Sequence, residues 1–275
     1  MHASLITAFY AGLVAIGVTV AIERLGGRLG GLIGSIPTTI IPASLGFWWA
    51  AESVPLFRDS LYAVPAGMVI NAIFLYSWRI LPKRLPALSL GMRLSAMVTL
   101  SLLIWAFFAA LLISAMESPP LPLVWVAVML CGGQLLLGGW ACRNNPPAPR
   151  GSRPVGAWTL LSRGILAALA IGVSVWMAEI GIVLLAGIAS VFPAIFLTTM
   201  VSVWWSQGEA VQAGAVGPLM LGSASVSVYA IVAAVSIPAL GLWWGPTLAW
   251  LLAVGTVSIP AWYWLSTKKQ ERSVT

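Results

Sequence analysis

Long apolar runs alternate with short polar connectors along the whole chain, and this pattern predicts a helical membrane protein. A helix that crosses a bilayer needs about 20 predominantly apolar residues. The runs that meet this requirement on their own lie at residues 5–22, 29–50, 60–78, 90–115, 121–142, 158–178 and 181–205. The connectors between these runs hold most of the charged residues.

The last apolar stretch is too long to form a single span. No charged residue occurs between Glu209 and Lys268. One helix over residues 210–267 would be about 87 Å long at 1.5 Å per residue, whereas the hydrocarbon core is about 30 Å thick. The stretch must fold back, and residues 237–241 are the expected turn because Pro238 and Gly241 interrupt helices. The pattern therefore predicts an all-α polytopic transmembrane bundle with nine spans.

Composition supports lipid as the solvent of this chain. Sixty per cent of the residues are hydrophobic and 8% are charged, whereas a soluble domain carries roughly 25% charged residues. The net charge of +7 does not indicate nucleic-acid binding, because no basic patch with interleaved aromatic residues lies outside the apolar runs. We therefore expect the lipid bilayer as a partner, and no nucleic acid.

The residues that common enzyme chemistries require are scarce. His2 is the single histidine, and no His, Cys, Asp and Glu cluster predicts a metal site. No glycine-rich loop ends in Gly-Lys-Ser/Thr, and no Ser/His/Asp or Cys/His set lies within the spans. Cys131 and Cys142 share one apolar run, so they are expected to be buried thiols. The sequence thus predicts neither a cofactor nor an enzyme.

The basic residues indicate how the chain is oriented. With nine spans and an outside N-terminus, only Arg58 falls on the outer side. The others fall on the cytoplasmic side: Arg24, Arg28, Arg79, Lys83, Arg84, Arg93, Arg143, Arg150, Arg153, Arg163, Lys268, Lys269 and Arg272. Cytoplasmic connectors of membrane proteins carry an excess of Lys and Arg. We therefore expect a multi-pass protein of the bacterial inner membrane, with its N-terminus outside and its C-terminus in the cytoplasm.

The two halves of the chain share an ordered series of residues at a nearly constant offset. The matches are Gly31 with Gly187, Pro37 with Pro193, Trp48-Trp49 with Trp204-Trp205, Pro65 with Pro218, and Tyr76 with Tyr229. They predict two four-helix repeats, at residues 1–118 and 157–275. Residues 119–156 would hold a linking fifth helix and a proline-rich linker. Because one helix separates the copies, the second would be inverted, which gives a 4+1+4 plan. Inverted repeats are common in secondary transporters. Duplication that merely enlarges the bundle is the alternative.

The second helix of each half carries a proline in its middle, beside hydroxyl-bearing residues. Such a proline frees a backbone carbonyl and kinks the helix. In lipid that carbonyl must find another donor or line a cavity, and transporters place broken helices near the midplane. The alternative is that the hydroxyls only satisfy the backbone. The expected substrate-binding residues are Ser35, Pro37, Thr38, Thr39, Asn71, Ser190, Pro193, Thr198 and Thr199.

A few further polar residues lie within or beside the spans. The amide of Asn71 needs partners in lipid, and bonding between helices is the alternative to a role in binding. The glutamates that flank the second helix of each half are candidates for gating or coupling, since ionisable groups near the bilayer are often functional. Their alternative role is to stabilise helix ends. They are Glu23, Glu52, Glu179 and Glu209.

Residues 186–193, which read Ala-Gly-Ile-Ala-Ser-Val-Phe-Pro, and the stretch from Gly31 to Pro37 resemble a known signature. It is the Ala-Gly-Leu…Phe-Pro pattern of the GlpM-type small bacterial inner-membrane proteins. Those proteins are about one repeat long, so the chain resembles a fused duplicate of them. The first half departs from the pattern, with Ile36 in place of the phenylalanine. The resemblance implies location and repeat structure, and no catalytic residue.

These patterns predict a secondary transporter or permease for a small neutral or weakly charged solute, bound between the two kinked helices. The scarcity of charge within the spans is the reason to expect such a solute. The alternative is a membrane scaffold or accessory subunit of an envelope complex that transports nothing. A second copy of the chain, or an envelope protein, would then be a further partner.

Overall fold

The computed structural model describes residues 2–25, 36–85, 89–117, 121–146 and 157–271, and every regular element within them is a helix. The first half contains α1 (His2–Leu25), α3 (Ile40–Ala50), α4 (Val54–Ile80), the 3-10 helix η1 (Leu81–Arg84) and α5 (Leu90–Glu117). Helix α6 (Leu123–Arg143) follows. The second half contains α7 (Ala157–Glu179), α8 (Val183–Ala189), α9 (Ala194–Gln207), α10 (Glu209–Gly222), α11 (Ala224–Ala253), the π-helical segment η2 (Val254–Ser258) and α12 (Ile259–Glu271).

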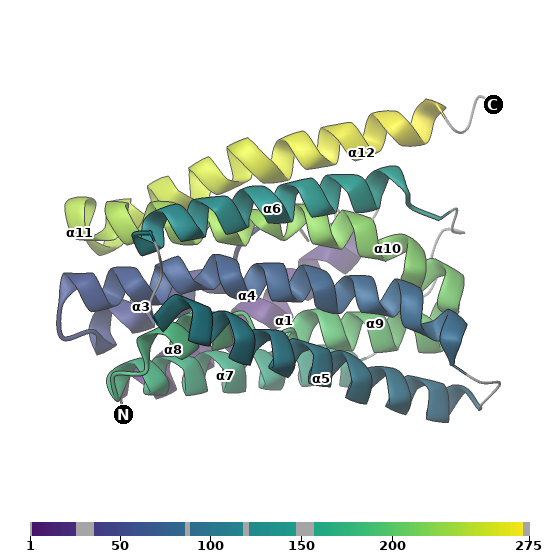
Figure 1. Ribbon diagram of the computed structural model, residues 1–275, viewed down its shortest axis with the longest axis horizontal. Helices are drawn as coiled ribbons and strands as arrows, with labels where there is room; N and C mark the ends of the chain where they lie inside the picture. The colour runs from purple at the N-terminus through teal and green to yellow at the C-terminus, as the bar shows by residue number, and fades with distance from the viewer. Residues whose placement is uncertain (1, 26–35, 86–88, 118–120, 147–156, 272–275) are drawn as a thin grey trace.

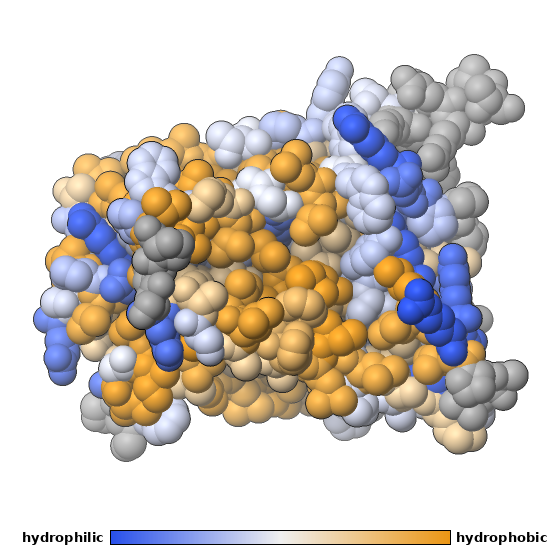
Figure 2. Space-filling view, viewed as in Figure 1, coloured by the Kyte–Doolittle hydropathy of each residue, from blue (hydrophilic) through white to orange (hydrophobic). Residues whose placement is uncertain are grey.

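The long helices lie side by side along one elongated bundle (Figure 1). The turn between α3 and α4, the turn between α7 and α8, and a bend within α11 at Gly241 lie at one end, which we call the hairpin end. Segment η1, the last turn of α6, the α9–α10 turn and the last turn of α12 lie at the opposite end, which we call the basic end. Figure 2 shows an apolar band across the visible face, with hydrophilic residues gathered at both ends.

The described helices have the length and surface of membrane spans. Among the described residues, seven stretches are long and apolar enough to cross a bilayer, and the last of them, Glu209–Thr267, has 59 residues. In the spanning window of α5 only 17% of the residues are buried, against 83% for α4. A bundle that exposes apolar side chains in this way requires lipid around it. The chain is therefore a multi-pass helical membrane protein.

The long final stretch folds back on itself within α11, where the sequence predicts a turn. Gly241 has φ 76° and ψ −179°, a conformation that interrupts the helix and that glycine adopts without steric cost. On either side of it the two arms touch, since the Ser236 Oγ donates a hydrogen bond of 2.8 Å to the Gly245 carbonyl. The stretch therefore forms two antiparallel arms that meet at the hairpin end.

Helix α4 is the centre of the bundle, and it packs against α5, α6, α8, α10 and α11. The largest apolar cluster joins it to α3, α7 and α11, with Phe47, Leu61 and Tyr229 fully buried. A second cluster around Trp78 and Trp204 fills the part of the bundle nearer the basic end. Helices α1 and α7, the first helices of the two halves, share the most extensive contact between any two elements.

Polar contacts at the basic end join different helices. The buried Arg79 of α4 donates to the Ala141 carbonyl of α6 at 3.0 Å and to the Oδ1 of Asn145. Arg93 of α5 forms an ion pair of 2.8 Å with Glu209, the first residue of α10. The guanidinium of Arg93 also lies 5.1 Å from the ring centroid of Trp204. These contacts connect the first half of the chain to α6 and to the second half.

Candidate substrate site at the broken helices

The second helix of the second half is broken at its proline, and not only kinked. Helix α8 ends at Ala189, α9 begins at Ala194, and Pro193 lies between them with φ −73° and ψ 34°. Shorter-range backbone bonds connect the segments, among them Phe192 N to Ala189 O at 2.9 Å and Ala194 N to Phe192 O at 2.7 Å. A proline has no N–H to continue the helical ladder. The break therefore leaves carbonyl groups that need donors from elsewhere.

One of these carbonyls, that of Val191, is bound by the side chain of Asn71 from α4. The Asn71 Nδ2 donates to it at 2.6 Å, and the Asn71 Oδ1 accepts a bond of 3.0 Å from the Trp105 Nε1 of α5. The Trp105 ring also packs edge-on against Phe192, with the ring centroids 5.2 Å apart. Asn71 is buried. A residue pair from the first half therefore holds the break of the second half.

The corresponding part of the first half is also non-helical. Residues 36–39 precede α3 without helical structure, and the Thr38 N–H donates to the Ile36 carbonyl at 2.9 Å. Pro37 is buried, while Thr38 and Thr39 are half-buried. Ser35 lies outside the described residues. Pro37 and Pro193, which the predicted repeat pairs with each other, thus both lie in non-helical segments that precede a helix.

The predicted site hydroxyls of the second half bond to backbone carbonyls of their own segments. Ser190 donates to Gly187, Thr198 donates to Ala194 and to Ile195, and Thr199 donates to Ile195. Thr199 also accepts a bond of 2.9 Å from the Nη2 of Arg163, a buried residue of α7. A hydroxyl oxygen that donates to a carbonyl retains acceptor capacity, which Arg163 uses at Thr199.

The predicted site residues of the first half and those of the second half belong to segments that pack against partly different helices. Helix α3 packs against α1, α4, α7 and α11, whereas α8 packs against α4, α5 and α7, and α9 packs against α5, α7 and α10. Helices α4 and α7 thus both pack against α3, which follows Thr39, and against α8, which precedes Ser190. The structure brings Asn71 to the α8–α9 break beside Ser190 and Pro193, and it places Thr199 against α7.

The four predicted glutamates lie at helix ends. Glu23 is in the last turns of α1, and its side chain lies outside the described set. Glu52 is exposed in the turn that precedes α4, and Glu179 is the last residue of α7. Glu209 pairs with Arg93, with side-chain exposures of 34% and 25% respectively. This ion pair connects Glu209 to α5 of the first half.

Sequence reasoning did not select Trp105, Arg163, Ser44 or Tyr229 as site residues. Arg163 entered only as an orientation signal, and Tyr229 only as the counterpart of Tyr76. The Tyr229 hydroxyl lies 2.8 Å from the Ser44 Oγ, a contact between α11 and α3 that no local pattern indicates. Trp105 likewise lies in a long apolar run, where no local pattern distinguishes it from its neighbours. A signal for these residues would require knowledge of which helices pack together.

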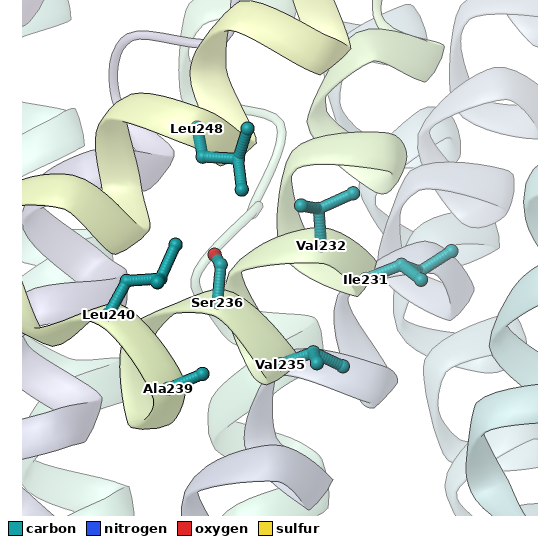
Figure 3. A pocket seen from close by; sticks show the side chains of 7 residues that line it. All are labelled: Ile231, Val232, Val235, Ser236, Ala239, Leu240 and Leu248. Atoms are coloured by element: carbon teal, nitrogen blue, oxygen red, sulfur yellow. The ribbon is translucent and has the colours of Figure 1, made fainter.

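A hollow of about 440 Å³ lies on the α11 hairpin, lined by residues from both of its arms (Figure 3). Its lining is Ile231, Val232, Val235, Ser236, Ala239, Leu240 and Leu248. The Ser236 hydroxyl is already bonded to Gly245, so the lining offers apolar groups to a ligand. None of the predicted substrate-binding residues is in this lining, and it is not the site predicted from the sequence.

No protein-family model, curated protein or solved structure matches this chain. Within the described ranges, no three His, Cys, Asp or Glu side chains gather as a metal ion would require. The function therefore has to be inferred from the geometry of the broken helices.

Proposed function

We propose that this protein is a secondary transporter or permease for a small neutral or weakly charged solute. The observation that carries the proposal is the α8–α9 break. There the Val191 carbonyl lies outside the helices and accepts a hydrogen bond from Asn71 of the other half. Discontinuous helices expose backbone groups within the membrane, and secondary transporters use such groups to bind solutes. Amide, indole and hydroxyl groups surround the break, which favours a solute with little net charge.

We further propose that the chain forms nine spans in two inverted four-helix repeats around α6. The bend at Gly241 supports two spans within residues 209–267, and the non-helical residues 36–39 correspond to the α8–α9 break. Helix α6 packs against α4. It also packs against α10 and α11, which together hold the repeat counterpart of α4. With the basic end in the cytoplasm of a bacterium, the N-terminus lies outside. A fused duplicate of a GlpM-like unit would have this architecture.

Solute uptake by the purified protein in liposomes tests the proposed function. Radiolabelled glycerol, urea, alanine and a monosaccharide are offered to proteoliposomes, with and without an imposed pH or sodium gradient. We expect at least one solute to enter at least tenfold faster than into protein-free liposomes of the same composition. Equal rates for folded protein and protein-free liposomes across this panel would contradict transport of this solute class and favour the scaffold alternative.

The threonines of the two broken helices provide a more specific prediction. Thr38→Val combined with Thr199→Val should reduce uptake at least tenfold, because valine keeps the β-branched shape but removes the hydroxyl. Each lost bond between helices should lower the free energy of unfolding by only about 1 kcal/mol. Uptake and melting temperature are measured on the same preparation.

Two other threonines provide the matched control for this double variant. Thr247 and Thr256 are exposed and bond to their own helix, at the carbonyls of Trp243 and Leu252. Thr247→Val with Thr256→Val should leave uptake unchanged. Normal uptake in the Thr38→Val and Thr199→Val protein would exclude these two hydroxyls from solute binding.

A further inference from the structure

A buried hydrogen bond connects the two halves of the chain towards the hairpin end. Ser44 of α3 donates to its own helix at the Ile41 carbonyl, at 2.8 Å. Its oxygen therefore accepts the proton of the Tyr229 hydroxyl, 2.8 Å away on α11. Both residues are fully buried. Ser44 lies six residues before the end of α3, and Tyr229 lies on the arm of α11 that leads to Gly241.

A second polar contact connects the two halves at the opposite end of the bundle. Arg93, in the first turn of α5, pairs with Glu209 at the start of α10. The same guanidinium lies over the ring of Trp204 from α9. This ion pair is partly exposed, unlike the hydroxyl pair at the hairpin end.

The predicted repeat allows the polar contacts at the two ends of the bundle to be compared residue by residue. Tyr229 corresponds to Tyr76, and the ungapped offset that pairs Gly31 with Gly187 also pairs Ser44 with Met200. The thioether of Met200 accepts a hydrogen bond from the Gln212 Nε2, and Tyr76 packs on Trp140. A methionine thioether is only a weak acceptor and has no proton to donate, so it cannot reproduce both bonds of Ser44. The two ends are therefore closed by different chemistry, although the repeats supply corresponding positions.

We propose that Tyr229 and Ser44 form the gate at the hairpin end, and that Arg93 and Glu209 form the gate at the basic end. This inference rests on the proposed function, because alternating access requires a closure on each side of the site. The α8–α9 break and Asn71 lie between these two contacts along the bundle. Breaking one gate shifts the population towards the conformation that is open at that end, since each bond stabilises only the closed form.

Buried positions close to each gate provide reporters. Ala233 is fully buried, one turn beyond Tyr229 towards Gly241, and Val216 is fully buried two turns inside Glu209. Ala233→Cys and Val216→Cys are placed singly in a protein that carries Cys131→Ala and Cys142→Ala. The membrane-impermeant thiol reagent sodium (2-sulfonatoethyl) methanethiosulfonate is added to right-side-out or to inverted membrane vesicles, and labelling rates are measured.

Tyr229→Phe and Ser44→Ala should each raise the labelling rate of Ala233→Cys about fivefold, which corresponds to about 1 kcal/mol for one bond between helices. The increase should occur only from the side of the hairpin end. Glu209→Gln should raise labelling of Val216→Cys about threefold, only from the basic end, because a partly exposed ion pair contributes less. None of these three substitutions should raise the labelling rate of the reporter at the opposite end.

Tyr263→Phe is the matched control, since Tyr263 is an exposed residue of α12. It should leave both rates unchanged. Unchanged labelling of Ala233→Cys in both Tyr229→Phe and Ser44→Ala would overturn the hairpin-end gate, and so would an increase from both sides of the membrane. Uptake is measured on the same variants. Side-specific labelling without uptake of any solute would support the gate and contradict transport. Uptake with unchanged labelling would support transport and contradict the gate.

Discussion

Gly138→Leu should destabilise the protein severely, whereas Gly139→Leu on the same helix should be almost without effect. A Cβ at Gly138 would lie 2.7 Å from the Cα and 2.8 Å from the N of Leu221, which are backbone atoms of α10. A Cβ at Gly139 would meet no atom within 4 Å. Backbone atoms cannot rotate away, so leucine at Gly138 must separate α6 from α10.

The expected loss for Gly138→Leu is at least about 3 kcal/mol, the upper range of overpacking, with a melting transition lowered or absent. Gly139→Leu should be neutral or slightly stabilising, because leucine favours helix over glycine by up to about 1 kcal/mol. Thermal unfolding in detergent, monitored by size-exclusion chromatography, compares the two proteins. Similar melting temperatures for both variants would contradict the close contact between α6 and α10.

Asn71→Leu should reduce uptake at least tenfold while the protein remains folded. The change removes the donor to the Val191 carbonyl and the acceptor of the Trp105 N–H, so two buried groups lose their partners. An unpaired buried group costs about 1–3 kcal/mol, but measured bonds between membrane helices average about 0.6 kcal/mol. We therefore expect a moderate loss of stability and at least a tenfold loss of uptake.

Gln134→Leu is the matched control for Asn71→Leu. Gln134 of α6 is also a fully buried amide with two partners on other elements, since it donates to Ser223 and accepts from Ser227. Both partners of Gln134 are side-chain hydroxyls of the α10–α11 segment, and neither is a backbone carbonyl of the α8–α9 break. Gln134→Leu should lower the melting temperature by a similar amount and retain uptake. If both variants lose uptake equally, the effect of Asn71 is one of general packing and not of the broken helix.

The sequence pattern predicts the local features of this fold well. The apolar runs and their breakers depend only on neighbouring residues, and the turn at Gly241 follows from an uncharged stretch too long for one helix. Pro193 indicates an interrupted helix for the same local reason. The interruption is larger than predicted: the pattern predicts a kinked helix, whereas the structure has two separate helices. A nearby donor such as Asn71 stabilises the freed carbonyl and makes the break tolerable within lipid.

The partners of the site residues could not be predicted in the same way. The contact between Asn71 and Val191 depends on the packing of α4 against α8, and the contact between Ser44 and Tyr229 depends on α3 packing against α11. Every apolar run in a membrane protein carries similar residues, so the pattern does not specify which runs are neighbours. The hydroxyl of Thr199 likewise accepts from Arg163, a residue whose charge indicates only orientation when the sequence is considered alone.

Alternating access between the broken helices depends on insertion of the two halves of the chain in opposite orientations. Single cysteines at Arg84, Ser118, Trp243 and Lys269, in a protein that lacks Cys131 and Cys142, test it with an impermeant maleimide on oriented membrane vesicles. Arg84 follows α4, and Trp243 follows the corresponding helix of the second half.

We expect Arg84→Cys and Lys269→Cys to be labelled only from the cytoplasmic side. Ser118→Cys and Trp243→Cys should be labelled only from the outside, because an inverted second half brings the end of its third helix to the opposite face. Labelling of Trp243→Cys from the same side as Arg84→Cys, or labelling of Lys269→Cys from the outside, would contradict the inverted arrangement.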